Sequence, residues 1–113
     1  MSYKVEATPA FRTQAKRLSK KYPSLKSELT VLSQSLAQHP EQGTPLGKDC
    51  YKIRLSIASK GKGKSGGARV ITCLVKVEET VYLAALFDKS EKESVSDKEL
   101  KEIVKEVINK KQK

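Results

Sequence analysis

The spacing of the apolar residues changes period twice along this chain, and each change restricts the folds open to it. From Phe11 to Leu36 apolar residues recur every three or four positions, as they do on one face of an amphipathic helix. Between Tyr51 and Phe87 they alternate with polar residues or run together in short β-branched stretches, which is typical of strands. After Ser96 the helical spacing returns. Such a chain is expected to pack helices against a sheet of consecutive strands.

Two helices are expected before the sheet. Thr8 can cap the first helix, and Pro9 suits its first turn. Pro23 separates the two helices, and Pro40 ends the second because the residue before a proline avoids the helical region. Together they predict an antiparallel helical hairpin. The apolar stripes are Phe11, Ala15, Leu18 and Tyr22 in the first helix and Leu25, Leu29, Leu32 and Leu36 in the second.

The sheet is expected to contain four strands, of which the last three follow one another directly. Glu78-Glu79 alone separates the final two, which predicts a tight hairpin. Short turns of this kind favour antiparallel pairing. The expected strands cover residues 3–7, 51–57, 69–77 and 80–87.

A last helix is expected to close the fold. It begins at Ser96, whose spacing from Glu99 is that of a capping box. No internal repeat or linker divides the chain, so residues 1–113 are expected to form one domain. The expected fold class is α+β: an antiparallel sheet with an N-terminal helical hairpin and a C-terminal helix, in the order β-α-α-β-β-β-α.

Neither a membrane span nor a secretion signal is expected. No apolar run approaches the ~20 residues needed to cross a bilayer. Residues 1–11 contain no apolar core of a signal peptide. Cys50 and Cys73 have the spacing of neither a disulfide framework nor a metal site, and are expected to be small packing residues. The protein is therefore expected to act in the cytoplasm.

Basic residues are concentrated in two blocks that contain no acid. The net charge of +10 favours a polyanionic partner, either nucleic acid or an acidic protein. Residues 7–27 hold six basic side chains and residues 50–77 hold seven, without an acidic one in either block. Residues 88–106 mix both signs, as an ordinary solvated face does. The two acid-free blocks are therefore the candidate contact surfaces for that partner.

The second block contains a glycine-rich loop, residues 59–68, in which lysine and glycine alternate. One interpretation is a flexible, solvated hairpin loop that its lysines keep soluble. The interpretation we favour is a mobile cationic arm, because glycine lets the backbone approach a phosphodiester chain and each lysine can displace a counterion. Lys60, Lys62 and Lys64 are then candidate RNA-binding residues.

Three further basic residues flank this loop on the expected strands. Alternation puts Lys52 and Arg54 on one strand face, and Arg69 begins the next strand, so the three are expected to converge on one patch. They are either ordinary outward-facing strand residues or a floor that grips phosphate. As a floor they stabilise the charge that develops on a phosphodiester, with Lys52 as the candidate base. Removing Arg69 is then expected to abolish activity and to leave thermal stability nearly intact.

Neither histidine nor metal chemistry is expected at this patch. His39 is the only histidine, and it lies before Pro40 at an expected helix end, where a cation favours the helix dipole. A capping or surface role is therefore expected for it. No carboxylate cluster lies near the basic block, so no metal and no other cofactor is expected.

Residues 51–93 resemble the RelE/ParE superfamily of toxins, most closely its HigB/RelE-like branch. The resemblance rests on a K-I-R strand that leads into an S-K-G-K-G-K-S-G-G-A-R loop, and the two-helix front and capped terminal helix extend it over nearly the whole chain. It implies a microbial ribonuclease fold. It also implies metal-independent mRNA cleavage in the ribosomal A site, by 2′-hydroxyl attack that gives a cyclic phosphate. The implied partner is a cognate antitoxin that wraps and neutralises the toxin of such a bacterial pair.

The same resemblance assigns roles to individual residues. Lys52, Arg54 and Arg69 match the family's basic strand residues, which act as base and stabilise the phosphate. Lys89 matches a basic residue after the last strand. The chain departs from RelE itself at two points that support substrate stacking and proton transfer there. Ser90 stands where that enzyme has an arginine, and residues 94–97 contain no tyrosine.

Three functions are compatible with these features. The first is a toxin that cleaves mRNA on the ribosome and so inhibits translation. The second is a ParE-like inhibitor of DNA gyrase, and the third is a non-catalytic RNA-binding relic. The presence of Lys52, Arg54 and Arg69 favours the first.

Overall fold

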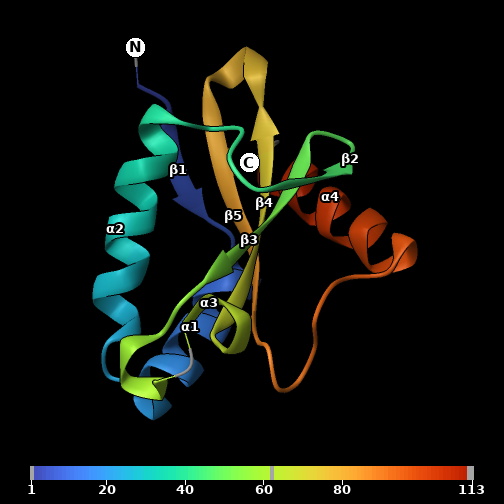
Figure 1. Ribbon diagram of the computed structural model, residues 1–113. Helices are drawn as coiled ribbons and strands as arrows, with labels where there is room; N and C mark the ends of the chain where they lie inside the picture. Colours follow the sequence, from blue (N-terminus) through green and yellow to red (C-terminus); the bar gives the residue numbers. More distant parts are fainter. Residues whose placement is uncertain (1, 62, 112–113) are drawn as a thin grey trace.

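The computed structural model describes residues 2–61 and 63–111, apart from the side chains of residues 64, 65, 110 and 111. These residues form one five-stranded sheet with helices on both faces (Figure 1). The strands are β1 (Lys4–Ala7), β2 (Thr44–Gly47), β3 (Cys50–Leu55), β4 (Ala68–Val75) and β5 (Thr80–Asp88). The helices are α1 (Pro9–Lys21), α2 (Leu25–Gln38), the four-residue α3 (Gly63–Gly66) and α4 (Asp97–Lys111), with 3₁₀ turns η1 (Ala58–Lys60) and η2 (Lys76–Glu78).

The predicted α+β fold class is confirmed, with two differences in the sheet. The strand order is β1-β5-β4-β3-β2, and β1 pairs with β5 in parallel, whereas the other neighbours are antiparallel. Short turns fix antiparallel pairing only between consecutive strands, and β1 is separated from β5 by most of the chain. The edge strand β2 was not expected, because its sequence Thr-Pro-Leu-Gly reads as a turn. Proline is tolerated in an edge strand, where its missing N–H faces away from the ladder.

The connection between β4 and β5 is longer than expected. The predicted hairpin is formed by the antiparallel strands β4 and β5, but β4 ends at Val75 and η2 with Glu79 makes the turn, so the expected two-residue turn is wrong. Glu79 adopts a left-handed conformation with φ of 50°, and its N–H donates to the carbonyl of Lys76 at 3.0 Å. The strand propensity of Lys76 and Val77 is thus overridden by a local turn, which leaves Val77 largely exposed.

The predicted helix caps are both formed. The hydroxyl of Thr8 accepts from the N–H of Phe11 at 3.2 Å, and Pro9 occupies the first turn of α1. At the start of α4 the N–H of Glu99 donates to the Ser96 hydroxyl at 3.1 Å, while the Glu99 carboxylate accepts from the N–H of Ser96 at 2.9 Å. This reciprocal pair is the capping box that the sequence predicts.

Thr8 also ties α1 to an irregularity in β5. Its hydroxyl is fully buried, 3.3 Å from the carbonyl oxygens of both Leu83 and Ala84. The register of β4 and β5 shifts at this point, since Ile71 pairs with Ala85 but Thr72 pairs with Leu83. Ala84 is therefore the extra residue of a β-bulge, which reverses the faces that the rest of β5 presents.

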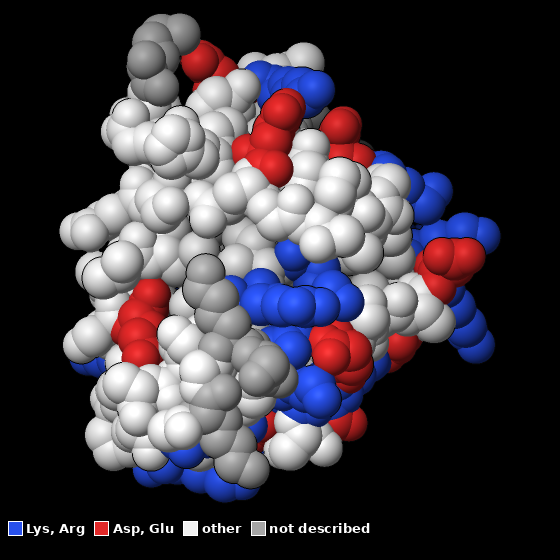
Figure 2. Space-filling model, in the orientation of Figure 1, with Lys and Arg blue, Asp and Glu red and all other residues white. Residues whose placement is uncertain are grey.

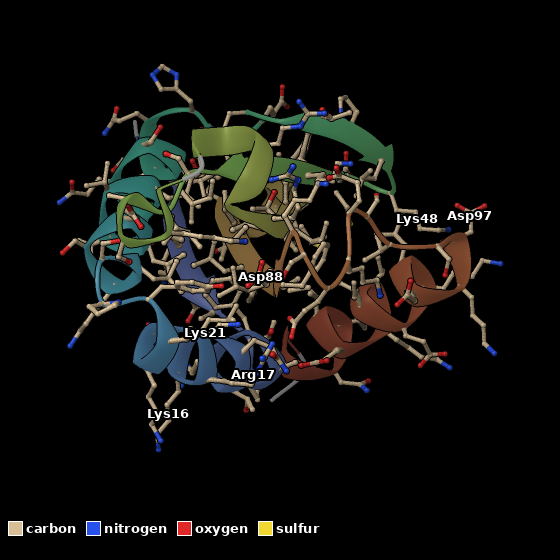
Figure 3. All side chains as sticks on the ribbon, turned by 60° about the horizontal axis from the view of Figure 1, so that its bottom comes forward. Lys16, Arg17, Lys21, Lys48, Asp88 and Asp97 are labelled. Atoms are coloured by element: carbon tan, nitrogen blue, oxygen red, sulfur yellow. The ribbon has the colours of Figure 1, made fainter. Side chains whose placement is uncertain are left out.

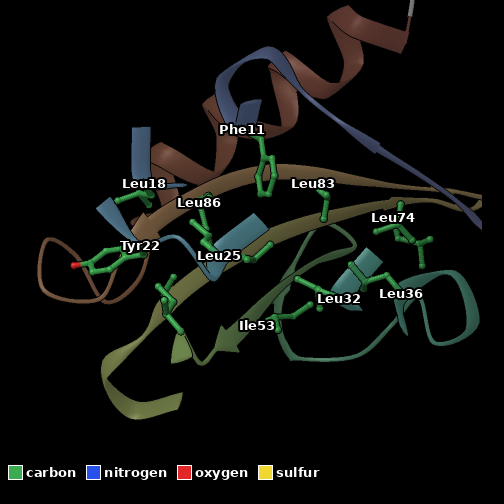
Figure 4. Close-up of a cluster of buried hydrophobic side chains, with 14 residues drawn as sticks. Phe11, Leu18, Tyr22, Leu25, Leu32, Leu36, Ile53, Leu74, Leu83 and Leu86 are labelled. Atoms are coloured by element: carbon green, nitrogen blue, oxygen red, sulfur yellow. The ribbon is translucent and has the colours of Figure 1, made fainter. Parts of the chain in front are cut away.

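Apolar side chains fill both sides of the sheet. On one face α1 and α2 pack on the strands through the two helical stripes and residues such as Val70 and Leu86 (Figure 4). On the other face α4 packs through Leu100 and Val107. Cys50 and Cys73 are buried on the α4 face, as expected of packing residues, and they are directly paired across β3 and β4.

Candidate nucleic-acid interface

The predicted basic residues of β3 and β4 lie on one face of the sheet. Arg54 pairs with Arg69 across the two strands, and Lys52 pairs with Ile71. Because side chains alternate along a strand, Lys52, Arg54 and Arg69 all share the face of Ile71, which is the α4 face. Their predicted convergence is confirmed, whereas their roles remain predictions.

These three residues differ sharply in exposure. Arg54 is exposed and Lys52 is half-buried, but Arg69 retains only 1% of its exposed surface. Its Nη1 donates to the carbonyl of Ala68 at 3.0 Å, and its Nε donates to a carboxylate oxygen of Glu93 at 2.6 Å. A buried guanidinium with an acidic partner contributes to the fold, so the expectation that Arg69 can be removed at little cost in stability does not fit this environment.

Glu93 is a component of the site that sequence reasoning missed. It lies between β5 and α4, and 49% of its side chain is exposed. Its second carboxylate oxygen is 3.9 Å from Nζ of Lys89. The hydrogen bond from Arg69 lowers the pKa of Glu93, and the charges of Arg69, Lys89 and Lys52 add to this effect. Its position four residues after Lys89 could have indicated that the two side chains pair. Because residues 88–106 mix acidic and basic side chains throughout, this one spacing did not stand out.

The surface reflects this arrangement. In Figure 2 basic side chains gather near the middle of one face, with an acidic patch directly beside them. Lys52, Arg54 and Lys89 are the accessible cations of the site, and Glu93 is the acid that contacts it. The face thus carries positive charge from β3, β4 and Lys89, together with the carboxylate of Glu93.

Lys60 does not belong to a mobile, solvated arm. Its side chain is only 11% exposed, its Nζ is 2.5 Å from Oδ1 of Asp88, and it also donates to the carbonyl of Gly67 at 3.3 Å. The ammonium group lies 5.6 Å from the centre of the Tyr22 ring, within cation–π range. The solvated-arm expectation is therefore wrong for Lys60, because its ammonium group pairs with Asp88, a residue of β5 that is distant in sequence.

Asp88 is the centre of a buried polar cluster, toward the middle of the molecule in Figure 3. It accepts from Tyr22 Oη at 2.7 Å and from both N–H and Oγ of Ser90 at 2.9 Å. Burial alone would raise the pKa of Asp88, but hydrogen bonds from Lys60, Ser90 and Tyr22 outweigh it and hold that pKa well below its usual range. No local pattern predicted this cluster, because Tyr22, Lys60 and Asp88 are far apart in the chain.

The cluster anchors the base of the glycine-rich loop. η1 begins the loop and α3 follows, so part of it is helical where an irregular loop was expected. Gly67 ends it, where an added Cβ would lie 2.0 Å from the carbonyl oxygen of Leu55. Lys62 lies outside the described residues, as does the side chain of Lys64, so their predicted RNA-binding roles remain open.

The two departures from RelE have local structural roles here. Ser90 satisfies Asp88 through both its N–H and its hydroxyl. Ser96, in the segment without a tyrosine, caps α4. Neither serine supplies an aromatic ring or a cation to the face around Arg69.

The first acid-free block forms a separate basic region. Lys16, Lys20 and Lys26 border a shallow groove of about 550 Å³ between α1 and α2. Arg17, by contrast, extends toward the segment after β5 and forms a bidentate pair with Glu91, the shorter contact being 2.9 Å. Figure 3 shows Lys16 on the outer side of α1.

The described residues, 2–61 and 63–111, contain neither a membrane-spanning helix nor a cluster of metal-binding side chains. No helix there is long and apolar enough to cross a membrane. The same residues contain no group of three or more histidine, cysteine or acidic side chains that could hold a metal ion.

Comparison with known proteins gives a consistent family. Residues 10–112 match the model of a family described as the RelE toxin of the RelE/RelB toxin–antitoxin system. A search of curated proteins returned no match. Since the family match spans almost the whole chain, it includes every residue of the face described above.

Solved structures of E. coli RelE share the fold at low sequence identity. An arginine double mutant in the free state has 15% identity and a TM-score of 0.62, with 97% of this chain and 98% of that chain covered. A chain of the intact E. coli RelBE toxin–antitoxin complex has 18% identity and a TM-score of 0.50, with 77% of this chain and 96% of that chain covered. The isolated E. coli RelE toxin has 19% identity and a TM-score of 0.50, with 94% and 99% covered.

Proposed function

The chain belongs to the RelE toxin family, and on that premise we propose that it inhibits translation as an mRNA endonuclease that works on the ribosome. The observation that carries this proposal is the arrangement of Lys52, Arg54 and Arg69 on one face of β3 and β4. Arg54 lies opposite Arg69 across the paired strands, and Lys52 lies two residues from Arg54 on the same face, so a single phosphodiester could contact more than one of them.

Cations in this arrangement suit cleavage through the 2′-hydroxyl. That reaction passes through a phosphorane whose extra negative charge must be stabilised, and preorganised positive groups supply this stabilisation. Arg54 is exposed and can approach the phosphate directly. Lys52 is half-buried beside it and is the proposed base for the 2′-hydroxyl proton. No metal or other cofactor takes part in the proposed reaction.

We propose two macromolecular partners. The first is mRNA in the ribosomal A site, with Lys62, Lys64 and Lys89 as further phosphate contacts and the cytoplasm as the compartment. The second is a cognate antitoxin that neutralises the chain. It is supported by the family match and by the similarity to a chain of the E. coli RelBE complex.

The test is translation of a defined mRNA in a purified bacterial system, with cleavage mapped by primer extension. We expect cleavage only when ribosomes are present, and a loss of ~10²-fold or more in rate for Lys52→Ala or Arg54→Ala. The matched control is Lys4→Ala, which removes the same charge from an exposed residue on β1, at the opposite edge of the sheet from β2.

Two outcomes would contradict the proposal. Equal cleavage rates for the control and for both site variants would show that Lys52 and Arg54 do not contribute to the reaction. Arrest of DNA synthesis without any mRNA cleavage would instead favour a gyrase inhibitor.

A further inference from the structure

Glu93 places its carboxylate directly on the guanidinium of Arg69. Its Oε2 is 2.6 Å from Nε of the arginine, and its Oε1 is 3.9 Å from Nζ of Lys89. A carboxylate on these two cations holds the position that a phosphate oxygen would need. RNA and Glu93 would therefore have to share the same donors.

We propose that Glu93 is a built-in competitor of the RNA phosphodiester: its carboxylate covers Arg69 in the free protein and gives way to the substrate phosphate. This inference rests on the proposed function, since it names how the substrate reaches that site. The exchange is one of hydrogen-bonded anions only, and no covalent bond changes.

The two partners differ in their freedom to move. Arg69 is buried and is also held by the carbonyl of Ala68, so its guanidinium is fixed. Glu93 is half exposed and lies between the end of β5 and the start of α4, outside any helix or strand. Water can solvate its carboxylate once it leaves. Glu93 is thus the partner that moves.

Charge explains why an anion must replace the carboxylate. A buried guanidinium left without a counter-charge is costly. A phosphodiester carries one negative charge, as Glu93 does, so Arg69 has a counter-charge both before and after the exchange. Uncharged ligands offer no such compensation, and the covered site therefore selects for phosphate over neutral groups.

Competition of this kind lowers the observed affinity in a predictable way. When the binding-competent form is only a fraction of the protein, the apparent dissociation constant rises by the inverse of that fraction. If Glu93 leaves Arg69 about a tenth of the time, removing its charge should strengthen phosphate binding roughly 10-fold.

Glu91 supplies a closely matched control on the same segment. It is also a glutamate with 49% of its side chain exposed, and it is also paired with an arginine, Arg17, at 2.9 Å. Glu91→Gln and Glu93→Gln remove the same charge from neighbouring positions. Only Glu93→Gln uncovers Arg69. The difference in RNA affinity between the two variants therefore measures the competition, because both variants gain equally from the loss of one negative charge.

The experiment measures binding of a short, non-cleavable 2′-O-methyl oligonucleotide to the free protein by fluorescence anisotropy. We expect Glu93→Gln to bind roughly 10-fold more tightly than wild type and Glu91→Gln to change affinity by less than about 2-fold. Glu93→Asp keeps the charge but shortens the reach, and it should also bind more tightly than wild type. Thermal unfolding of each variant verifies that it is folded.

A second readout follows the arginine itself. The Nε–Hε signal of Arg69, observed by NMR, should shift when inorganic phosphate is added, and it should do so at lower phosphate concentration in Glu93→Gln. This measurement needs neither ribosome nor cleavage. A protein that fails to inhibit translation but shows the shift would refute the proposed function and leave the competition intact.

Three results would overturn the inference. Equal gains for Glu93→Gln and Glu91→Gln would reduce the effect to net charge. No response of Arg69 to phosphate or oligonucleotide in Glu93→Gln would mean that no anion exchanges there. Unchanged affinity with lost mRNA cleavage in Glu93→Gln would make Glu93 a catalytic group instead of a competitor.

Discussion

Replacing Lys60 by methionine should destabilise the protein by about 3 kcal/mol, because it breaks a buried ion pair from one side. The Lys60 side chain is 11% exposed and that of Asp88 is 1% exposed. Removing one member of such a pair typically costs about 3–5 kcal/mol. Asp88 keeps its hydrogen bonds from Tyr22 and Ser90, which favours the lower end. Methionine is unbranched and of similar length to lysine but carries no charge, so the loss reports mainly the ammonium group.

The assay is thermal and urea unfolding followed by circular dichroism. A loss of about 3 kcal/mol should lower Tm by roughly 10–15 °C in a chain of this size. The control is Arg17→Met, which breaks an ion pair whose two side chains are both 49% exposed. Exposed pairs contribute about 1 kcal/mol or less, so this variant should unfold near the wild-type temperature. Similar losses in the two variants would refute the assignment of Lys60 to a buried structural pair.

The same pair determines how stability depends on acid. The folded protein holds the pKa of Asp88 below its ordinary value, so the carboxylate stabilises the fold at all pH values above its unfolded pKa of ~3.9. That contribution is lost as pH falls toward the folded pKa. Without Lys60 the folded pKa of Asp88 should rise toward the unfolded value, so both states take up the proton over the same pH range and Lys60→Met should lose less stability than wild type as pH falls below ~3.9.

Three further predictions concern the neighbouring residues. Gly67→Ala should destabilise the fold by more than about 2 kcal/mol in urea unfolding, because its Cβ would meet the Leu55 carbonyl oxygen at 2.0 Å; wild-type stability would mean that the β3–β4 approach is looser. Arg69→Ala should lose at least about 2 kcal/mol by creating a void where the buried Arg69 side chain packs, and an unchanged Tm would return Arg69 to the surface-like role expected from sequence. RNA affinity should fall roughly 100-fold between 50 and 200 mM salt if about five phosphates are contacted, and a flat response would exclude the electrostatic contacts.

Sequence patterns predicted the parts of the fold that depend on local chemistry. The stripe ending at Leu36, the cap at Thr8 and the box of Ser96 and Glu99 each involve residues within one helix, so their spacing is sufficient. The shared face of Lys52 and Arg54 follows from strand alternation alone. Such features require no knowledge of which segments meet in space.

The parts that failed depend on partners far away in the chain. Lys60 looked like one of several loop lysines, and only the approach of Asp88 makes it buried and structural. Arg69 looked like a strand residue open to substrate, and only the segment after β5 covers it with Glu93. The number of charged residues in a segment does not reveal which acidic side chain pairs with a basic site and which one faces water.

One residue in β5 connects these two errors. Ala84 is the bulge at which Thr8 inserts its hydroxyl, and beyond it each side chain lies on the face opposite to the one that strict alternation would give. Asp88 therefore turns toward Tyr22 and Lys60, while Phe87 lies opposite Arg69 on the α4 face. The run Leu-Ala-Ala-Leu-Phe is compatible with either alternation, so the sequence alone cannot assign Asp88 to a face. The contact that stabilises the bulge comes from Thr8 at the start of α1, so α1 and β5 together determine which carboxylate anchors the glycine-rich loop.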